Sequence, residues 1–111
     1  MEQLLRPDGR KGIAMPKNRY ERLKAFILSF LDDEHETTLN ELLEKGIQTD
    51  NEARLESEKS WSILQVKLDL EACGLIRAFV PEYSRKTNYL KITRQGQKVL
   101  RQERMVGEPG L

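Results

Sequence analysis

Few residues in this chain could bind a metal ion. The only histidine, His35, lies within residues 32–36, Asp-Asp-Glu-His-Glu, and carboxylate and imidazole groups are common metal ligands. The run lacks the D-x-D-x-D-G spacing that folds oxygen ligands around a hard cation. We therefore expect a solvated connector and no metal site at this position.

Groups that could carry covalent chemistry are equally few. Cys73 is the only cysteine, which excludes an internal disulfide and a multi-cysteine zinc site. It falls at an apolar helical position, so we expect a buried, inert thiol. The sequence has no glycine-rich phosphate loop, no G-x-S-x-G motif and no Cys–His pair at an interpretable spacing. These observations predict neither an enzyme nor a cofactor.

Basic side chains, which bind phosphate groups, occur early in the chain. Residues 1–16 hold Arg6, Arg10 and Lys11 among prolines and glycines, without a sustained hydrophobic period. This composition predicts a flexible basic arm, in which Arg10 and Lys11 follow phosphates or enter a minor groove. A disordered leader or a strap on a partner subunit would have the same composition.

Charge alternates in blocks along the 111 residues, although the net charge is only +1. Seven basic and three acidic residues occupy 1–31, two and ten occupy 32–58, and ten and five occupy 59–111. Such blocks predict surfaces of opposite potential. The sequence has no apolar run that could span a membrane and no signal-peptide core at its start. We therefore expect a cytoplasmic protein with a single domain and no membrane contact.

A helix is predicted after the basic arm. Asn18 and Glu21 have the capping-box spacing, and we expect the helix to end near Asp32 or Asp33, where acidic residues oppose the helix dipole. We expect the apolar face of this helix in the core, with the phenylalanines also available to a partner. That face consists of Tyr20, Leu23, Phe26, Ile27, Phe30 and Leu31.

A second, shorter helix follows. Thr38 and Glu41 repeat the capping-box spacing, and the helix runs from Leu39 to about Lys45, with Gly46 as its C-cap. The polar residues that follow, up to 58, fit either a long turn or a continuation of the helix.

The most apolar segment is residues 60–73. Counted at about 100° per residue, its apolar side chains form two rows on roughly opposite sides of a helix. A helix that is apolar on both sides must be covered on both, either by other elements or by a second copy of the domain. Trp61 is accordingly a candidate dimer or partner contact, with core packing as the alternative. The rows are Trp61, Leu64, Leu68 and Ala72, and Ile63, Val66, Leu70 and Cys73.

A small β-hairpin is predicted after this helix. Gly74 ends the helix, and residues 76–80 and 89–92 alternate between apolar and polar side chains, as strands do. Residues 82–86 form the tip of the hairpin, and Thr93 caps a last helix that continues to about residue 104.

Two short motifs in this region resemble the winged helix-turn-helix regulators of the MarR, ArsR and PadR type. In those families L-E-x-x-G-L-I ends the recognition helix, and L-T-x-x-G closes the wing. Here the matching positions, within a resemblance over residues 19–104, are Leu70, Glu71, Gly74, Leu75, Ile76, Ile92, Thr93 and Gly96.

The resemblance implies a mainly α fold with a small antiparallel β-hairpin, that is, an α+β winged helix. Its parts would be three helices, a two-stranded wing and a C-terminal helix. The domain would occupy residues 17–104, after the arm at 1–16 and before a frayed tail at 105–111.

The resemblance also implies a homodimeric transcription regulator that binds double-stranded DNA. The start of the helix at 60–73 would enter the major groove, and the wing would contact the DNA backbone. Glu52, Glu56 and Glu58, with Asp69 further along the same helix, depart from the family pattern, because carboxylates repel phosphates. The implied contacts are Lys59, Ser60, Ser62 and Gln65 on the helix, and Arg85 and Lys86 on the wing.

Winged helices also serve as protein-docking modules, which is the alternative reading of this sequence. In that case the acidic belt at 32–58, or the second apolar side of 60–73, binds a protein, and DNA plays no part. The sequence does not indicate an effector ligand for either role.

Overall fold

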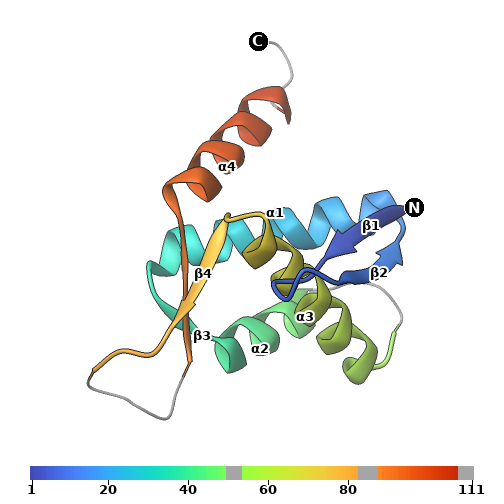
Figure 1. Ribbon diagram of the computed structural model, residues 1–111, viewed down its shortest axis with the longest axis horizontal. Helices are drawn as coiled ribbons and strands as arrows, with labels where there is room; N and C mark the ends of the chain where they lie inside the picture. The colour runs from blue at the N-terminus through green and yellow to red at the C-terminus, as the bar shows by residue number, and fades with distance from the viewer. Residues whose placement is uncertain (50–53, 83–87, 108–111) are drawn as a thin grey trace.

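The structure is a computed structural model that describes residues 1–49, 54–82 and 88–107. Figure 1 shows how the described helices and strands are arranged. In chain order they are β1 (Glu2–Leu5), β2 (Lys11–Met15), α1 (Lys17–Glu34), β3 (Thr37–Thr38), α2 (Leu39–Thr49), α3 (Glu56–Ala72), β4 (Ile76–Phe79), β5 (Tyr89–Ile92) and α4 (Arg94–Gly107). Among the described helices, none is long and apolar enough to cross a membrane.

The chain has a winged-helix fold of the α+β class, as the sequence predicts. Helices α1, α2 and α3 pack against one another, and α3 leads through a glycine turn into the antiparallel strands β4 and β5. Strand β3 pairs with β5 through Thr37 opposite Leu90, which gives the strand order β3-β5-β4. We did not predict β3, because a strand of two residues has no periodicity to detect.

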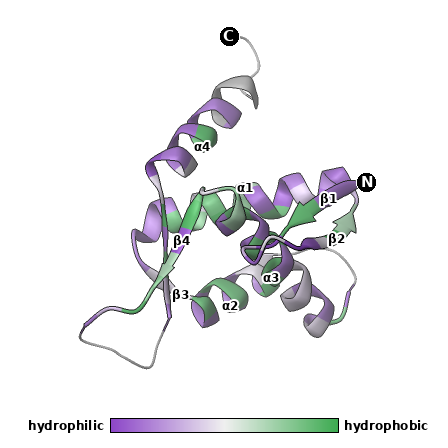
Figure 2. Cartoon of the chain, viewed as in Figure 1, coloured by the Kyte–Doolittle hydropathy of each residue, from purple (hydrophilic) through white to green (hydrophobic). Residues whose placement is uncertain are grey.

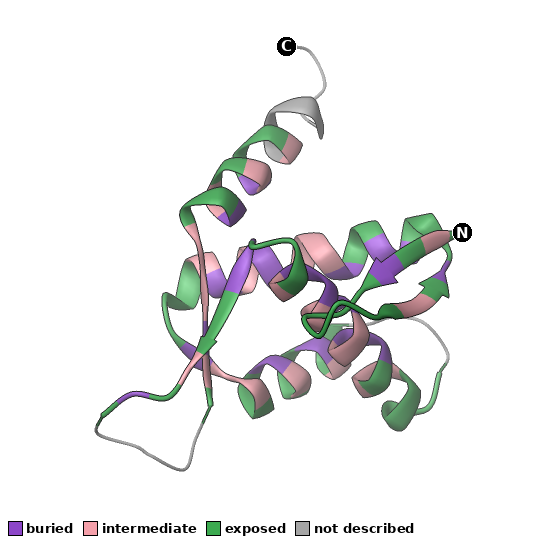
Figure 3. Cartoon of the chain, in the orientation of Figure 1, coloured by how far each residue is buried: buried purple, intermediate pink, exposed green. Residues whose placement is uncertain are grey.

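The hydrophobic core lies between the three helices and the sheet, where Figure 3 shows the buried residues. Each helix contributes the apolar side of its 3.6-residue period. Figure 2 shows that hydrophilic residues dominate α4, which packs against α1 and contributes Leu100 to the core. The fully or almost fully buried side chains are Ile27, Leu28 and Leu31 of α1, Leu42 of α2, Ile63, Val66 and Leu70 of α3, Leu90 of β5 and Leu100 of α4.

Residues 2–15 form a β-hairpin, so the prediction of a flexible basic arm at 1–16 is wrong. Its turn is closed by the Gly9 amide, which donates to the Arg6 carbonyl at 3.0 Å. Leu4 is fully buried and Met15 is 4% exposed, both in the common core. Burying two such side chains contributes about 2 kcal/mol each, which helps to hold the hairpin on the body. The hairpin lies against α3 (Figure 1).

Helix α2 continues three residues beyond the expected C-cap at Gly46. A Cβ at this position would overlap the Cδ1 atom of Ile63 and lie 3.3 Å from the Phe26 ring. Gly46 is therefore a site of close contact between α2 and its neighbours, and not a helix stop. The predicted N-cap of α2 is confirmed, since the Glu41 amide donates to Thr38 Oγ1 at 3.1 Å.

The start of α1 differs from the prediction in its cap. Pro16 occupies the N-cap position, without a side-chain hydrogen bond, and Asn18 lies inside the first turn. The fixed φ of proline suits entry into a helix. Proline has no side-chain oxygen, however, so no capping side chain satisfies the amide groups of this turn.

The junction between the wing and α4 confirms the predicted cap at Thr93. Its Oγ1 accepts a hydrogen bond from the Gly96 amide at 3.1 Å and donates one to the Gly74 carbonyl at 2.7 Å. Its own amide donates to the Leu75 carbonyl at 3.0 Å. One threonine thus joins the end of α3 to the start of α4.

Candidate nucleic-acid interface

Helix α3 holds the position of the recognition helix, and its two apolar rows have different environments. Ile63, Val66 and Leu70 are fully buried against α1, α2 and the sheet. On the other side Trp61 is 50% exposed and Ala72 is exposed, while Leu64 and Leu68 are half-buried. The expectation that both sides are covered is therefore confirmed for one side within the chain, and cover of the other side by a second copy stays a prediction.

Three of the four predicted DNA contacts on α3 are half-buried, namely Lys59, Ser60 and Gln65. Ser62 is 7% exposed and faces the hairpin, which removes it from a surface that could meet bases. The first turn of α3 carries the exposed residues Glu56 and Glu58. These carboxylates suit the positive end of the helix dipole but oppose phosphates.

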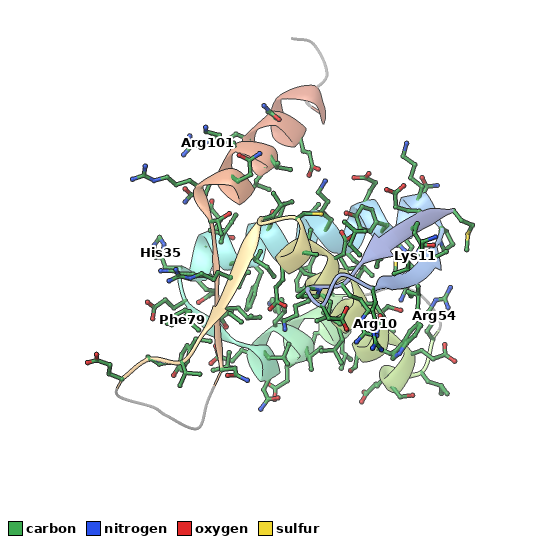
Figure 4. The ribbon with its side chains drawn as sticks, viewed as in Figure 1. Arg10, Lys11, His35, Arg54, Phe79 and Arg101 are labelled. Atoms are coloured by element: carbon green, nitrogen blue, oxygen red, sulfur yellow. The ribbon has the colours of Figure 1, made fainter. Side chains whose placement is uncertain are left out.

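The turn of the β1–β2 hairpin presents cations beside α3. Arg10 and Lys11 are exposed, and Arg6 forms an ion pair with Asp8 at 3.0 Å. The Asp8 carboxylate also accepts the Arg10 amide at 3.0 Å, which fixes the turn. Figure 4 shows Arg10, Lys11 and Arg54 on one side of the molecule, and the hairpin turn with Arg10 lies beside Ala72 at the C-terminal end of α3.

The wing is described only at its base. Phe79 of β4 and Tyr89 of β5 lie with ring centroids 6.0 Å apart, and the Nζ atom of Lys91 lies 5.3 Å from the Phe79 centroid. These cross-strand contacts stiffen the two strands where they leave the body. The predicted wing contacts Arg85 and Lys86 lie outside the described residues.

Phe26 and Phe30 pack within the chain. Their rings stack with centroids 5.8 Å apart, and both are half-buried against the hydrophobic core. Phe26 also lies against the glycine of α2. Trp61 is the most exposed of the three aromatic residues that the sequence suggested for a partner interface.

Asp69 of α3, which we predicted only as an acid that opposes DNA, holds the hairpin in place. Its carboxylate is 3% exposed and accepts the Leu5 amide at 2.8 Å and the Tyr20 hydroxyl at 2.6 Å. Burial, followed by the hydrogen bond with Asp69, raises the pKa of Tyr20 well above its usual value. The phenol therefore remains protonated and donates to the carboxylate at neutral pH. Tyr20 and Asp69 both lie on the core-facing side of their helices. A buried carboxylate needs a hydrogen-bond donor, and this need is the signal in the sequence that could have suggested the contact.

Cys73 is exposed, so the prediction of a buried thiol is wrong. The residue follows the last residue of α3, where the chain turns away from the core towards Gly74. Partial burial, and then the negative charge of Asp69, raise the pKa of the thiol. Within the described residues, His, Cys, Asp and Glu form no cluster that could hold a metal ion.

A thiol that is exposed but has a raised pKa should react with iodoacetamide completely and slowly. Native protein should become fully alkylated. The alkylation rate of the native protein should reach half of its maximum at a higher pH than the rate of the chain unfolded in urea, because the native protein holds less thiolate at each pH. Mass spectrometry of timed samples measures both rates. Equal pH profiles for the two states, or a native thiol that resists alkylation, would contradict this expectation.

The fold and sequence can now be compared with known proteins. No curated protein matches the chain in sequence. A solved structure with a similar fold is the transcriptional regulator BldR from Sulfolobus solfataricus, with a TM-score of 0.53 and 19% identity. The match covers 81% of this chain and 64% of that regulator, so the chain spans less than two thirds of it. At this identity the likeness shows the fold alone.

A family model matches residues 2–86, which include the hairpin, the three helices and the first strand of the wing. The match extends over well more than half of the chain. The protein therefore belongs to a family of unknown function, DUF6958.

Proposed function

We propose that this chain is a DNA-binding transcription regulator that holds duplex DNA against the outer side of α3, the hairpin turn and the wing. The observation that carries the proposal is the winged-helix fold with exposed Arg10 and Lys11 placed beside the recognition helix. The fold similarity to a transcriptional regulator supports it. Assignment to the MarR, ArsR or PadR type remains a prediction from the sequence.

Phosphate contacts would provide most of the affinity in this arrangement. The outward side of α3 offers an indole ring, two half-buried leucines and acidic residues in its first turn, a poor surface for reading base edges. Cations at the hairpin turn can neutralise phosphates on either side of a groove. We therefore expect binding that depends strongly on salt and weakly on sequence.

The double variant Arg10→Gln/Lys11→Gln should bind duplex DNA more weakly than the native protein. If both side chains contact phosphates, the slope of log K against log salt should fall by about 2. Fluorescence anisotropy with a labelled random-sequence duplex, at about 50 and about 200 mM salt, measures the slope. Arg101→Gln is the matched control, since Figure 4 places Arg101 on α4, away from the hairpin. No binding by native protein at the lower salt concentration would overturn the proposal.

A second candidate function is protein docking, and one observation favours it. Leu55 is 68% exposed and Trp61 is 50% exposed, so two large apolar side chains flank the start of α3. The homodimer predicted from the sequence is one form of such docking. Light scattering of the native protein and of Trp61→Ala, with and without duplex DNA, separates the two roles. A Trp61-dependent dimer that ignores DNA would favour docking.

The predicted cytoplasmic location belongs to the same proposal. A regulator of this kind acts in the compartment that holds the DNA.

A further inference from the structure

The outer face of strands β4 and β5, which points away from the hydrophobic core, carries aromatic and cationic side chains together. Successive side chains of a strand point to opposite faces, and residues directly opposite each other in antiparallel strands share a face. Ile76 lies opposite Ile92, and both belong to the core side with Leu90. The alternate pairs face outwards, and they are Arg77 with Lys91 and Phe79 with Tyr89.

The two aromatic rings on this face form a small π surface with a cation beside it. The ring centroids of Phe79 and Tyr89 are 6.0 Å apart, the rings are tilted by 38°, and both residues are half-buried. The Nζ atom of Lys91 lies 5.3 Å from the Phe79 centroid, and Arg77 is exposed. Aromatic rings stack on nucleic-acid bases, and cations bind phosphates, so this face holds the groups for both contacts.

A row of cations continues from this face along α4. Arg94, Lys98 and Arg101 follow one another at i, i+4 and i+7, a spacing that places them on one side of the helix. All three are exposed. Lys91 of the outer sheet face and Arg94, the first residue of α4, are three residues apart, so the row begins where the sheet ends.

The other side of α4 faces α1 and holds the only acid of this helix. The Glu103 carboxylate pairs with Lys24 Nζ at 3.0 Å, and Gln97 donates to Asp32 Oδ1 at 3.3 Å. Leu100 lies on the same side and is buried in the core. The outward side of α4 therefore carries positive charge without a carboxylate of the same helix.

The sheet face and the row of α4 together form one surface, which we call the outer path. Figure 4 shows Phe79 and Arg101 at the opposite end of the molecule from Arg10 and Lys11 of the hairpin. Two exposed acids, Glu36 before β3 and Glu82 after β4, are the described neighbours in the chain that oppose phosphates. The cations of the outer path outnumber them, and they are Arg77, Lys91, Arg94, Lys98 and Arg101.

We propose that the outer path binds a single strand of nucleic acid. Unpaired bases stack against Phe79 and Tyr89, and the phosphates that follow lie along the cations of β5 and α4. The bases of a duplex are stacked on one another and cannot lie against rings on a sheet, whereas every unpaired base offers a π face. An acidic protein segment would use the cations and leave the rings without a role. The outer path shares only the wing with the duplex site proposed above.

Binding is tested by fluorescence anisotropy of the full chain with a labelled oligothymidine of about 10 nucleotides, at about 50 mM salt. We expect saturable binding. A strand of the same length and charge, in which abasic sites replace the thymidines, should bind at least about tenfold more weakly, because it has phosphates but no bases to stack. The difference between the two strands measures the contribution of the bases directly.

Variants of the rings and of the cations locate the site. Phe79→Leu and Tyr89→Leu should each weaken oligothymidine binding by about tenfold and leave the weak binding of the abasic strand unchanged. Arg94→Gln/Lys98→Gln should lower the slope of log K against log salt by about 1.4, the value for two phosphate contacts with a single strand.

The matched control for the cations is Lys17→Gln/Lys45→Gln, which removes two exposed cations from α1 and α2 and should keep the native slope. Circular dichroism and thermal unfolding show whether each variant is folded. A labelled oligouridine of the same length distinguishes the two sources of single strands. Tighter binding of oligouridine supports an RNA strand, tighter binding of oligothymidine supports a DNA strand, and both support stacking on the outer path.

Three results would overturn the proposal. The first is the absence of saturable binding by native protein at the lower salt concentration. The second is equal affinity for the oligothymidine and the abasic strand, which would show a purely electrostatic surface of the kind that an acidic protein fits. The third is native affinity in folded Phe79→Leu and Tyr89→Leu. The duplex proposal does not depend on these results, since Arg10→Gln/Lys11→Gln tests it with a different probe.

Discussion

Replacing Asp69 with alanine should lower the free energy of unfolding by about 3 kcal/mol. The change leaves the Leu5 amide and the Tyr20 hydroxyl without their acceptor in a region where the carboxylate is 3% exposed. A buried donor that loses its partner costs about 1–3 kcal/mol, and hydrogen bonds to a charged acceptor are at the upper end. Urea denaturation monitored by circular dichroism measures the loss.

Tyr20→Phe is the matched control, because it removes one of the two hydrogen bonds and keeps the ring. We expect it to cost about 1–2 kcal/mol, less than Asp69→Ala. Amide hydrogen exchange measures the effect locally. In Asp69→Ala the amides of residues 3–15 should lose more protection from exchange than the amides of α1. A hairpin that keeps full protection in that variant would show that Leu4 and Met15 alone hold it.

Gly96→Ala should be similarly damaging for a steric reason. A Cβ at Gly96 would overlap the backbone carbonyl oxygen of Leu75 and lie 2.7 Å from Ile92 Cγ1. The obstacle is backbone at the junction of α3, the wing and α4, which has little freedom to move. We expect a loss of about 3 kcal/mol in the free energy of unfolding, at the upper end of overpacking effects, measured by thermal and urea unfolding.

Gly9→Ala provides the comparison for this prediction. Gly9 has a φ of +82°, but nothing lies within 4 Å of the Cβ it lacks. The substitution should therefore cost only about 1 kcal/mol, from the left-handed backbone conformation. Equal losses for the two variants would mean that the junction at Leu75 relaxes readily and that packing there is not tight.

The parts of the fold that the sequence predicted correctly depend on local rules. The caps at Thr38 and Thr93 and the strands around Ile76 and Ile92 each require only residues within a few positions of one another. The helix that Gly74 ends was identified from its apolar spacing, although α3 begins at Glu56, four residues before the predicted start. These elements were sufficient to identify a winged helix.

The errors occurred where a distant partner decides the structure. Gly46 has the local features of a helix stop, but Ile63 and Phe26 make it a close-packing position within α2. The hairpin at 2–15 had a detectable signal, a Pro-Asp-Gly turn between two apolar stretches, which its arginines obscured. Its stability comes from Leu4 and Met15 in a core formed by other elements, and no local pattern reveals that.

The same distinction applies to the candidate site. The sequence suggested Arg10 and Lys11 as DNA contacts; both are exposed, and their contact with DNA stays a prediction. The sequence placed Ser62 on a DNA-binding surface. In the structure the hairpin covers this residue, and no pattern local to α3 could show that. Asp69 looked like an acid opposing DNA, and its true partners are a tyrosine on α1 and an amide on β1.

The anchoring of the hairpin also has a consequence for the order of synthesis. The Leu5 amide and its acceptor on Asp69 are 64 residues apart, so the ribosome makes the hairpin long before α3. At about 5–20 residues per second, β1 waits roughly 3 to 13 s for that carboxylate. During this interval Leu4 lacks the side chains of α3 that cover it in the folded core. The hairpin, which is made before α3, is thus among the last segments to reach its final contacts.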